Sequence, residues 1–373
     1  MRDDGKARLA AQGPLKGRGA GSRVPGRFDR RSASREDDGW GSGHDFTDAS
    51  GEALEPGPDT VVTAERARSI ISCNQSPDIG FGQSVNPYRG CEHGCVYCFA
   101  RPSHAYLDLS PGLDFETRLF AKTNAAELLR AELARPRYRC APIALGVNTD
   151  AYQPLERRQR ITRELLDVLA ETRHPVHLIT KNALVLRDLD LLAPMARENL
   201  VQVSLSVTTL DNRLAARMEP RASAPHARLK AIAGLRAAGV PVSVMVAPVI
   251  PAITDGELES ILGAAREAGA DGASYVLLRL PHELKEIWRE WLAQHYPERA
   301  AHVMSLVAQM RGGRDYDSAF GSRMKGQGPF AQLLAARFAR AHRQLGFTPP
   351  PALDCSRFIA PRLVAESPQG SLF

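Results

Sequence analysis

The sequence predicts an α/β fold, a partial TIM-like (β/α)6 barrel with a disordered N-terminal tail and a helical C-terminal extension. Short β-branched runs alternate with amphipathic stretches from about residue 80 onward, which is typical of a parallel sheet covered by helices. Six such repeats are fewer than the eight that close a full barrel. The strands stop after residue 281, and residues 1–60 show almost no apolar periodicity.

Each repeat pairs a short apolar run with a longer helical pattern. The expected strands are 84–88, 143–148, 176–180, 201–207, 242–247 and 273–278. The expected helices between them are 123–134, 157–172, 183–197, 223–238 and 255–268, and Gly239 and Gly269 stand where helix C-caps are expected. Functional residues of such a fold gather at the C-terminal ends of the strands.

Three parts are expected along the chain. Residues 1–60 are rich in Gly, Arg, Ser, Asp and Pro, a composition that cannot bury enough surface to offset its ordering entropy. Residues 61–280 hold the barrel. Residues 281–373 contain helical stretches at 282–294, 297–311 and 330–345 around a Gly-rich loop, 312–328, and we expect them to form a cap over the barrel mouth.

The net charge of +6 gives mild support for a nucleic-acid partner. Residues 1–36 carry ten Lys or Arg against four acids, and residues 37–60 carry seven acids and no Lys or Arg. The remaining excess is spread along the chain. No apolar run of about 18 residues is present, so we expect no membrane span. The N-terminus lacks the apolar stretch of a secretory signal, so we expect a cytoplasmic protein.

The six cysteines do not form a disulfide framework, because three of them fall within eight residues. Cys91, Cys95 and Cys98 are spaced C-x3-C-x2-C directly after the first strand. Three thiolates in one loop can hold three corners of a 4Fe–4S cubane and leave the fourth iron without a protein ligand. Such an iron can chelate the amino and carboxylate groups of S-adenosylmethionine. The reduced cluster can then break a C–S bond and free a 5′-deoxyadenosyl radical.

The main alternative for this loop is zinc, with His93 or His104 as a fourth ligand. Structural zinc loops usually come as two separated ligand pairs, and no second pair is present here. A two-cluster ferredoxin pattern would need a fourth cysteine nearby. The competing function is therefore a non-enzymatic iron–sulfur or zinc protein that binds nucleic acid.

Residues 86–102 resemble the cluster loop of radical S-adenosylmethionine (radical SAM) enzymes, which share the pattern C-x3-C-x-aromatic-C. The resemblance implies that Tyr97 packs against the adenine of the cofactor. A one-electron reductant such as flavodoxin or ferredoxin is the expected partner. More narrowly, residues 87–255 resemble the branch that contains spore photoproduct lyase, and the whole chain resembles an uncharacterised bacterial subgroup of it. The likeness lies in 146–150, 179–182, 201–206, 247–251, 311–318 and 320–324.

The same resemblance implies cofactor contacts at the strand ends. Lys181 is expected to meet the cofactor carboxylate, although a solvent-reaching lysine would fit the same position. Ser206 is expected to be the cofactor-contacting serine, and Ser204 lies on the same face of its strand. The Gly-Gly-Glu motif of many relatives is absent, so Thr149 or Asp150 is expected to grip the cofactor amino group or else to cap the next helix.

The resemblance fails at one position. Val147 stands where the lyase carries a hydrogen-donating cysteine, which argues against spore photoproduct repair. Cys140 precedes its strand, at the wrong end of the barrel, while Cys73 and Cys355 have no assigned role; Cys355 would reach the mouth if the C-terminal region folded over it.

The substrate stays open between a nucleic-acid lesion, a modified RNA base and a protein residue. Four charged residues would bind an anionic substrate or the cofactor carboxylate, or would form ion pairs on the surface: Arg217, Glu219, Arg221 and Arg279. The basic loop 311–325 is compatible with a phosphate-bearing partner and equally with a mobile active-site lid.

Overall fold

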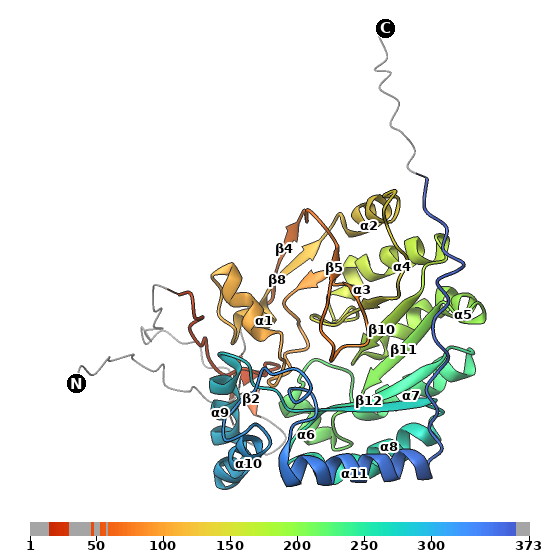
Figure 1. Ribbon diagram of the computed structural model, residues 1–373. Coiled ribbons are helices and arrows are strands. Elements are labelled where there is room, and N and C mark those ends of the chain that lie inside the picture. The colour runs from red at the N-terminus through yellow and green to blue at the C-terminus, as the bar shows by residue number, and fades with distance from the viewer. Residues whose placement is uncertain (1–14, 30–45, 48–52, 57–58, 363–373) are drawn as a thin grey trace.

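The computed structural model describes residues 15–29, 46–47, 53–56 and 59–362. Among them no helix is long and apolar enough to cross a membrane. Figure 1 shows a sheet in the middle of the molecule with helices along its outer side and a second helical group beside the N-terminal segment.

The central sheet has seven strands in the order β13-β12-β11-β10-β9-β6-β5. The strands are β5 (Ile71–Cys73), β6 (Gln83–Val85), β9 (Ile143–Leu145), β10 (Val176–Thr180), β11 (Val201–Ser206), β12 (Val242–Val249) and β13 (Gly272–Leu277). β5 is antiparallel to β6, and the other six strands are parallel. The six predicted parallel strands are thus confirmed. The sheet is open, with β13 and β5 at its edges, and its curvature into a partial barrel stays a prediction.

The connections between parallel strands are helical, as predicted. They are α2 (Ala125–Leu133), α3 (Glu156–Gln159), α4 (Ile161–Glu171), the 3-10 turn Ala183–Asp188, α5 (Leu189–Arg197), α7 (Pro225–Ala237), the 3-10 turn Asp255–Glu257 and α8 (Leu258–Glu267). α4 shows why: Ile161, Leu165, Leu166 and Leu169 recur at helical spacing and are all buried against the sheet. The predicted single helix over 157–172 is divided at Arg160, whose φ of 54° breaks the helical path.

A second, smaller sheet holds the segment around the cysteines. β4 (Val61–Glu65) pairs with β8 (Arg118–Lys122), and β8 pairs with β7 (Tyr88–Arg89). Between β7 and β8 lie the 3-10 helix Arg101–Leu107 and α1 (Asp114–Thr117). Residues 90–117 connect the antiparallel strands β7 and β8, and this connection begins with the cysteine loop.

The C-terminal helices are α9 (Leu284–His295), α10 (Pro297–Gln309) and α11 (Gly328–Gln344). α9 and α10 share a core with the cysteine loop, in which Trp288 stacks on Trp291 at 5.0 Å between ring centroids. α11 instead runs along α8, where Arg337 pairs with Glu259 at 2.6 Å (Figure 1). Only α9 and α10 therefore lie beside the cysteine loop.

The segment after α11 crosses the opposite end of the sheet. Backbone N–H groups of Thr348, Asp354 and Ile359 donate to carbonyls of residues 271, 199 and 172, which precede β13, β11 and β10. Cys355 accordingly lies next to Cys140, whose pKa is raised to about 12 by burial and by this neighbour. The alternative in which Cys355 approaches the barrel mouth is wrong.

Residues 15–29 correct the expectation of a disordered tail. This segment contains β1 (Leu15–Lys16), and its Leu15, Ala20 and Val24 side chains are buried against the cysteine loop and α9. The prediction failed here because the segment has no periodic pattern of apolar residues. Its close packing depends on the backbone of its glycines. Residues 46–47 (β2) and 53–56 (β3) pair with each other; the rest of 1–58 lies outside the described residues.

Candidate cluster and cofactor site

The cysteine loop follows β7 and is tied down by backbone hydrogen bonds at several points. Cys91 N–H donates to the Phe115 carbonyl at 2.9 Å, and Val96 N–H donates to the Met218 carbonyl at 2.9 Å, at the end of α6 (Asn212–Met218). Gly94 adopts a φ of 67°, and a Cβ there would lie 2.3 Å from the Glu116 carboxylate. Glycine is therefore required between the first two cysteines.

Cys91 and Cys95 are buried, and Cys98 is half-buried. Burial raises the pKa of Cys91 and Cys95 well above the ordinary thiol value, and the neighbouring thiols raise that of Cys91 further. Burial also raises the pKa of Cys98, while the N–H groups of Ala100 and Arg101 donate toward its sulfur and oppose the rise. Three thiols of this kind give up their protons to a bound metal centre.

A fully buried ion pair fixes the far side of the loop. Arg101 donates to the carbonyls of Gly94 and Cys95, both at 2.9 Å, and pairs with Glu116 at 2.9 Å. Both side chains are fully buried. Removing one partner of such a pair costs about 3–5 kcal/mol, whereas an exposed pair contributes roughly 0–1 kcal/mol. This pair therefore determines the loop conformation far more than the surface ion pairs do.

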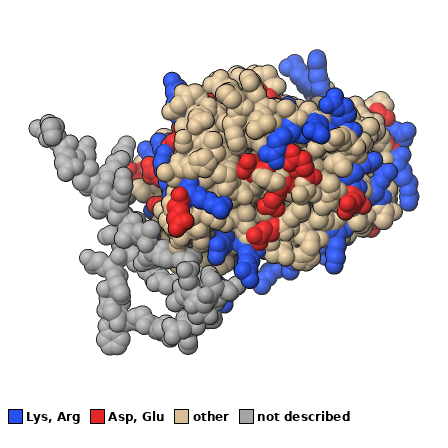
Figure 2. Space-filling model, turned by 90° about the horizontal axis from the view of Figure 1, so that it is seen from below, with Lys and Arg blue, Asp and Glu red and all other residues tan. Residues whose placement is uncertain are grey.

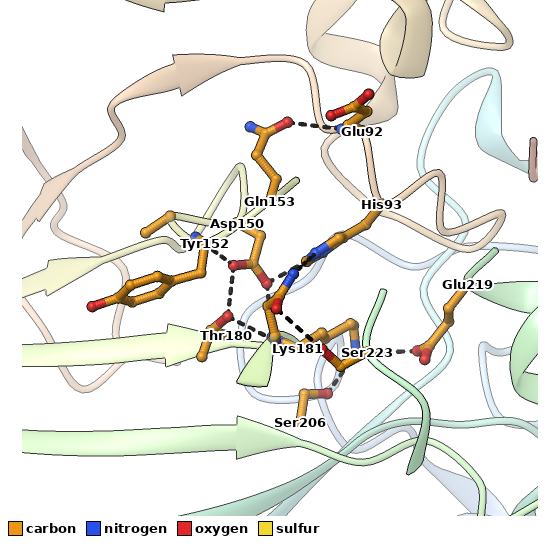
Figure 3. A network of polar contacts seen from close by, with 12 residues as sticks. Glu92, His93, Asp150, Tyr152, Gln153, Thr180, Lys181, Ser206, Glu219 and Ser223 are labelled. Carbon is orange, nitrogen blue, oxygen red and sulfur yellow. Dashed lines mark hydrogen bonds and ion pairs between the residues drawn. The ribbon is translucent and has the colours of Figure 1, made fainter. Parts of the chain in front are cut away.

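On the inner side, a polar network joins the loop to the ends of β9 and β10 (Figure 3). Gln153 accepts from the Glu92 N–H at 2.8 Å and donates to the Gly90 carbonyl at 3.2 Å. The buried His93 ring lies between Asp150, at 3.4 Å, and Asn182, at 3.1 Å. Both imidazole nitrogens thus have protein partners.

Lys181 is the centre of a second network at the C-terminal ends of β10, β11 and β12 (Figure 3). Its Nζ donates to Ser206 Oγ at 2.5 Å and to the Ala247 carbonyl at 3.0 Å, and it lies 3.4 Å from Glu219. Glu219 also pairs with the buried Arg228. Two cations thus share the Glu219 carboxylate. Burial lowers the pKa of Lys181 to about 8, while the nearby Asp150 carboxylate opposes that shift.

Tyr97 connects this network to the cysteine loop. Its hydroxyl lies 3.2 Å from Thr208 Oγ1, and Lys181 Nζ lies 5.5 Å from the centre of its ring. The side chain is 94% buried. The structure therefore brings the side chains of Tyr97, Lys181 and Ser206 together beside the cysteine loop.

Thr149 and Asp150 also lie at this end of the sheet, but each has protein partners. The Asp150 carboxylate accepts from the Lys181 N–H and from Thr180 Oγ1, both at 2.7 Å, and from the Tyr152 N–H at 2.9 Å. Thr149 Oγ1 donates to the Tyr88 carbonyl at 3.0 Å. Their expected contact with the cofactor amino group stays a prediction.

The charged residues singled out in the sequence separate into two groups. Arg221 pairs with Glu92 at 3.0 Å, and Glu219 is occupied by Lys181 and Arg228. Arg279 has no carboxylate partner among the described residues; its guanidinium lies 5.1 Å from the ring centre of Phe99, directly after the third cysteine. The loop 312–328 approaches the same strand end, where Leu277 N–H donates to the Met324 carbonyl at 3.0 Å.

The cysteine loop offers three sulfur donors, and two histidines lie nearby. In the described ranges no group of three or more His, Cys, Asp or Glu side chains is placed to hold a single metal ion. His93 is held by Asp150 and Asn182. His104 Nε2 lies 2.9 Å from the Arg118 carbonyl, and its buried Nδ1 has no hydrogen-bond partner among the described residues.

The comparisons with known proteins agree with this geometry. The model of the Radical SAM superfamily matches residues 85–265. An uncharacterised protein of Mycobacterium tuberculosis, Rv2578c, is 43% identical over 228 residues, which cover 61% of this chain and 67% of the relative. An uncharacterised Methanocaldococcus jannaschii protein, MJ0683, is 25% identical over 247 residues, covering 66% and 88%. The chain belongs to the radical SAM superfamily.

Solved structures of spore photoproduct lyase share the fold. A variant with bound AdoMet and dinucleoside spore photoproduct superimposes with a TM-score of 0.54 at 16% identity, covering 78% of this chain and 82% of that one. Another structure, of the lyase complexed with dinucleoside spore photoproduct, gives a TM-score of 0.54 at 15% identity, covering 77% of this chain and 80% of that one. At this identity the likeness establishes the fold alone.

Sequence reasoning missed the residues that hold the cysteine loop from outside. Arg101 stood in the motif without a role, and Glu116, Gln153 and Arg228 were not singled out. A charged residue three positions after the last cysteine of the motif was the only signal in the sequence, since its partners come from other segments of the chain.

Proposed function

We propose that this protein is a radical SAM enzyme in which Cys91, Cys95 and Cys98 bind a 4Fe–4S cluster and the residues around Lys181 bind S-adenosylmethionine. When bound, the cluster supplies one electron to the sulfonium, which yields methionine and a 5′-deoxyadenosyl radical that abstracts a hydrogen atom from the substrate. Membership of the superfamily supports this proposal over a non-enzymatic zinc or iron–sulfur protein.

One observation carries the proposal. A loop that carries three cysteines lies beside Lys181, a largely buried ammonium that shares the Glu219 carboxylate with Arg228. A buried ammonium needs an anionic partner, and the cofactor carboxylate would provide it.

The residues around Lys181 would contact different parts of S-adenosylmethionine. Lys181 and Ser206 would hold the carboxylate, because the ammonium and the hydroxyl are already 2.5 Å apart and both face the strand ends. Tyr97 would pack against the adenine. Thr149 and Asp150 would orient the amino group, Asp150 mainly by holding the backbone of Lys181 in place.

For the substrate, we propose an anionic molecule that carries phosphate, with nucleic acid as the first candidate. Arg279 supports this, since it is a cation without a carboxylate partner in the described part of the chain and lies against the exposed Phe99 ring. An arginine beside an exposed aromatic ring suits a phosphate next to a base. Spore photoproduct repair is not proposed, because the half-buried Val147 has no S–H bond to donate.

Anaerobic reconstitution with iron and sulfide, followed by dithionite and S-adenosylmethionine, tests the proposal. We expect a brown protein with close to four irons per chain and release of 5′-deoxyadenosine even without substrate. Cys95→Ala should abolish the product, while Cys73→Ala, at an exposed cysteine away from the loop, should retain it. Persistence of the product in Cys95→Ala, or a colourless protein with one zinc, would overturn the proposal.

A further inference from the structure

Residues 15–29 cover the outside of the cysteine loop, and we call them the N-terminal strap. We propose that this strap is the outer wall of the cluster site, and that Gly19 and Glu116 are positioning residues that join the wall to the cysteine loop and keep water away from the cluster. The inference rests on the proposed function, since it assigns a role toward the cluster to a segment that sequence analysis treated as tail.

Gly19 is the point of closest approach. A Cβ built on Gly19 would lie 1.7 Å from the Gly94 carbonyl oxygen and 3.2 Å from the Val96 nitrogen. All of these neighbours are backbone atoms of the cysteine loop, so no flexible side chain can move aside. Only glycine allows the strap to lie this close.

Glu116 joins the strap to the loop. Its two carboxylate oxygens accept the N–H groups of Gly19, at 3.0 Å, and Ala20, at 2.9 Å. The same carboxylate pairs with Arg101, whose guanidinium binds the carbonyls of Gly94 and Cys95. One buried side chain thus fixes both the wall and the chain segment between two proposed cluster ligands.

The strap is also anchored along its length, which separates it from a loosely attached tail. The Ser22 carbonyl accepts a hydrogen bond from the Leu113 N–H at 3.1 Å, and the Ser22 hydroxyl donates one to Glu290 at 2.5 Å. Arg23 pairs with Asp114 at 3.0 Å, and Arg27 pairs with Glu283 of the neighbouring helical group at 2.9 Å. These anchors span α1, α9 and the turn that precedes α9.

The consequence for a cluster follows from its charge. The reduction potential of an iron–sulfur cluster depends on hydrogen bonds to its sulfurs and on its exposure to solvent. Water stabilises the more negatively charged reduced state, so opening the wall raises the potential. A cluster with a higher potential is a weaker reductant toward a sulfonium, and it is also open to oxygen.

The test compares Gly19→Ala with Gly80→Ala, because a Cβ at Gly80 meets nothing within 4 Å and its φ is not positive. We expect Gly19→Ala to bind iron at the wild-type level under anaerobic conditions, to shift the potential to more positive values in an EPR-monitored titration, and to lose its cluster in air about 10-fold faster. Hydrogen exchange should accelerate in residues 15–29. Gly80→Ala should behave as wild type.

Two further variants keep the test decisive. Arg27→Ala removes an anchor to Glu283 that meets the cysteine loop only at its far end, where the guanidinium donates to the Pro102 carbonyl at 3.4 Å. It should change potential and air sensitivity in the same direction by a smaller amount. Glu116→Asp, which retains the charge, should restore part of what Glu116→Ala loses. Wild-type potential and air sensitivity in Gly19→Ala and Arg27→Ala, with iron bound, would overturn the inference alone, whereas a wild-type protein that holds no cluster would overturn the proposed function itself.

Discussion

Lys181 shows how a single residue can report on the cofactor. Its ammonium is buried, shares Glu219 with Arg228 and donates to Ser206 and the Ala247 carbonyl. Burial lowers its pKa to about 8, so the group is largely charged near neutral pH. Its three N–H donors already have protein partners, so an incoming carboxylate would replace one of these contacts.

Replacing Lys181 with Ala should weaken S-adenosylmethionine binding by about 10-fold or more, because a hydrogen bond to a charged group contributes roughly 1.5–3 kcal/mol. Iron content should remain that of the wild type. Equilibrium binding under anaerobic conditions measures the effect, with Lys285→Ala on the exposed side of α9 as the matched control. Loss of iron in Lys181→Ala would show instead that the residue supports the cysteine loop.

Arg279 makes a separate prediction about the substrate. Arg279→Ala should leave substrate-free formation of 5′-deoxyadenosine unchanged, because the guanidinium lies against Phe99 rather than in the Lys181 network. Stimulation by an anionic substrate should fall about 10-fold. The exposed Arg299→Ala serves as control. Equal loss of product with and without substrate would place Arg279 in the cofactor site.

At the scale of elements, the C-terminal segment and the turn before β10 meet around a buried histidine. His174 Nδ1 donates to the Pro175 carbonyl at 3.0 Å, Nε2 lies 2.7 Å from the Tyr138 hydroxyl, and the Phe358 ring packs at 5.3 Å. Burial lowers the pKa of His174 to about 4. The folded protein therefore holds this ring neutral.

The sign of the pH dependence follows from that pKa. An unfolded histidine titrates near 6.5, so between pH 6.5 and pH 4 the unfolded chain binds a proton that the folded chain does not. The contribution of His174 to the free energy of unfolding is therefore fully present above pH 6.5. It is lost as the pH falls toward 4, by up to a few kcal/mol. Chemical denaturation of cluster-free protein at pH 7 and pH 5 measures this effect. The free energy of unfolding should decrease less between the two pH values in His174→Gln than in the wild type, and an equal decrease would contradict the role of His174.

The elements also show what a sequence can and cannot predict. β10 occupies 176–180 as expected, and the other parallel strands differ by a few residues, because alternating apolar runs directly encode a buried sheet. The small sheet was missed, since β4 and β8 pair across more than fifty residues with little periodicity. The strap was missed for a related reason: its stability comes from Gly19 against Gly94 and from Glu116, contacts that no local pattern reveals.

The candidate site also has a part that the sequence predicts and a part that it does not. Cys91, Cys95 and Cys98 follow from spacing alone, and the positions of Lys181 and Ser206 follow from their place at strand ends. The Arg101–Glu116 ion pair could not be predicted from the sequence. The two residues meet only because the pairing of β7 with β8 folds the segment between these strands back on itself.

At the scale of the whole molecule, the net charge of +6 is modest, and after residue 60 the excess of basic residues is spread along the sequence. On the face that Figure 2 shows, basic and acidic side chains are interspersed. We therefore expect a nucleic-acid substrate to be held by a few local phosphate contacts.

This arrangement predicts a shallow salt dependence. A short single-stranded oligonucleotide should raise 5′-deoxyadenosine formation above the substrate-free level, and the stimulation should decline only gently with salt because few phosphates are contacted. Product analysis over a salt series measures it, with a neutral peptide as comparison. Stimulation by the peptide and not by the oligonucleotide would point to a protein substrate.

The central claim is that one iron of the cluster is open to the cofactor. EPR of the dithionite-reduced protein, recorded with and without S-adenosylmethionine, tests it most directly, because a ligand on that iron changes the electronic structure of the cluster. We expect g-values that shift when the cofactor is added to the wild-type protein and shift much less at the same cofactor concentration in Lys181→Ala. A reduced 4Fe–4S spectrum that is identical with and without saturating cofactor would contradict it.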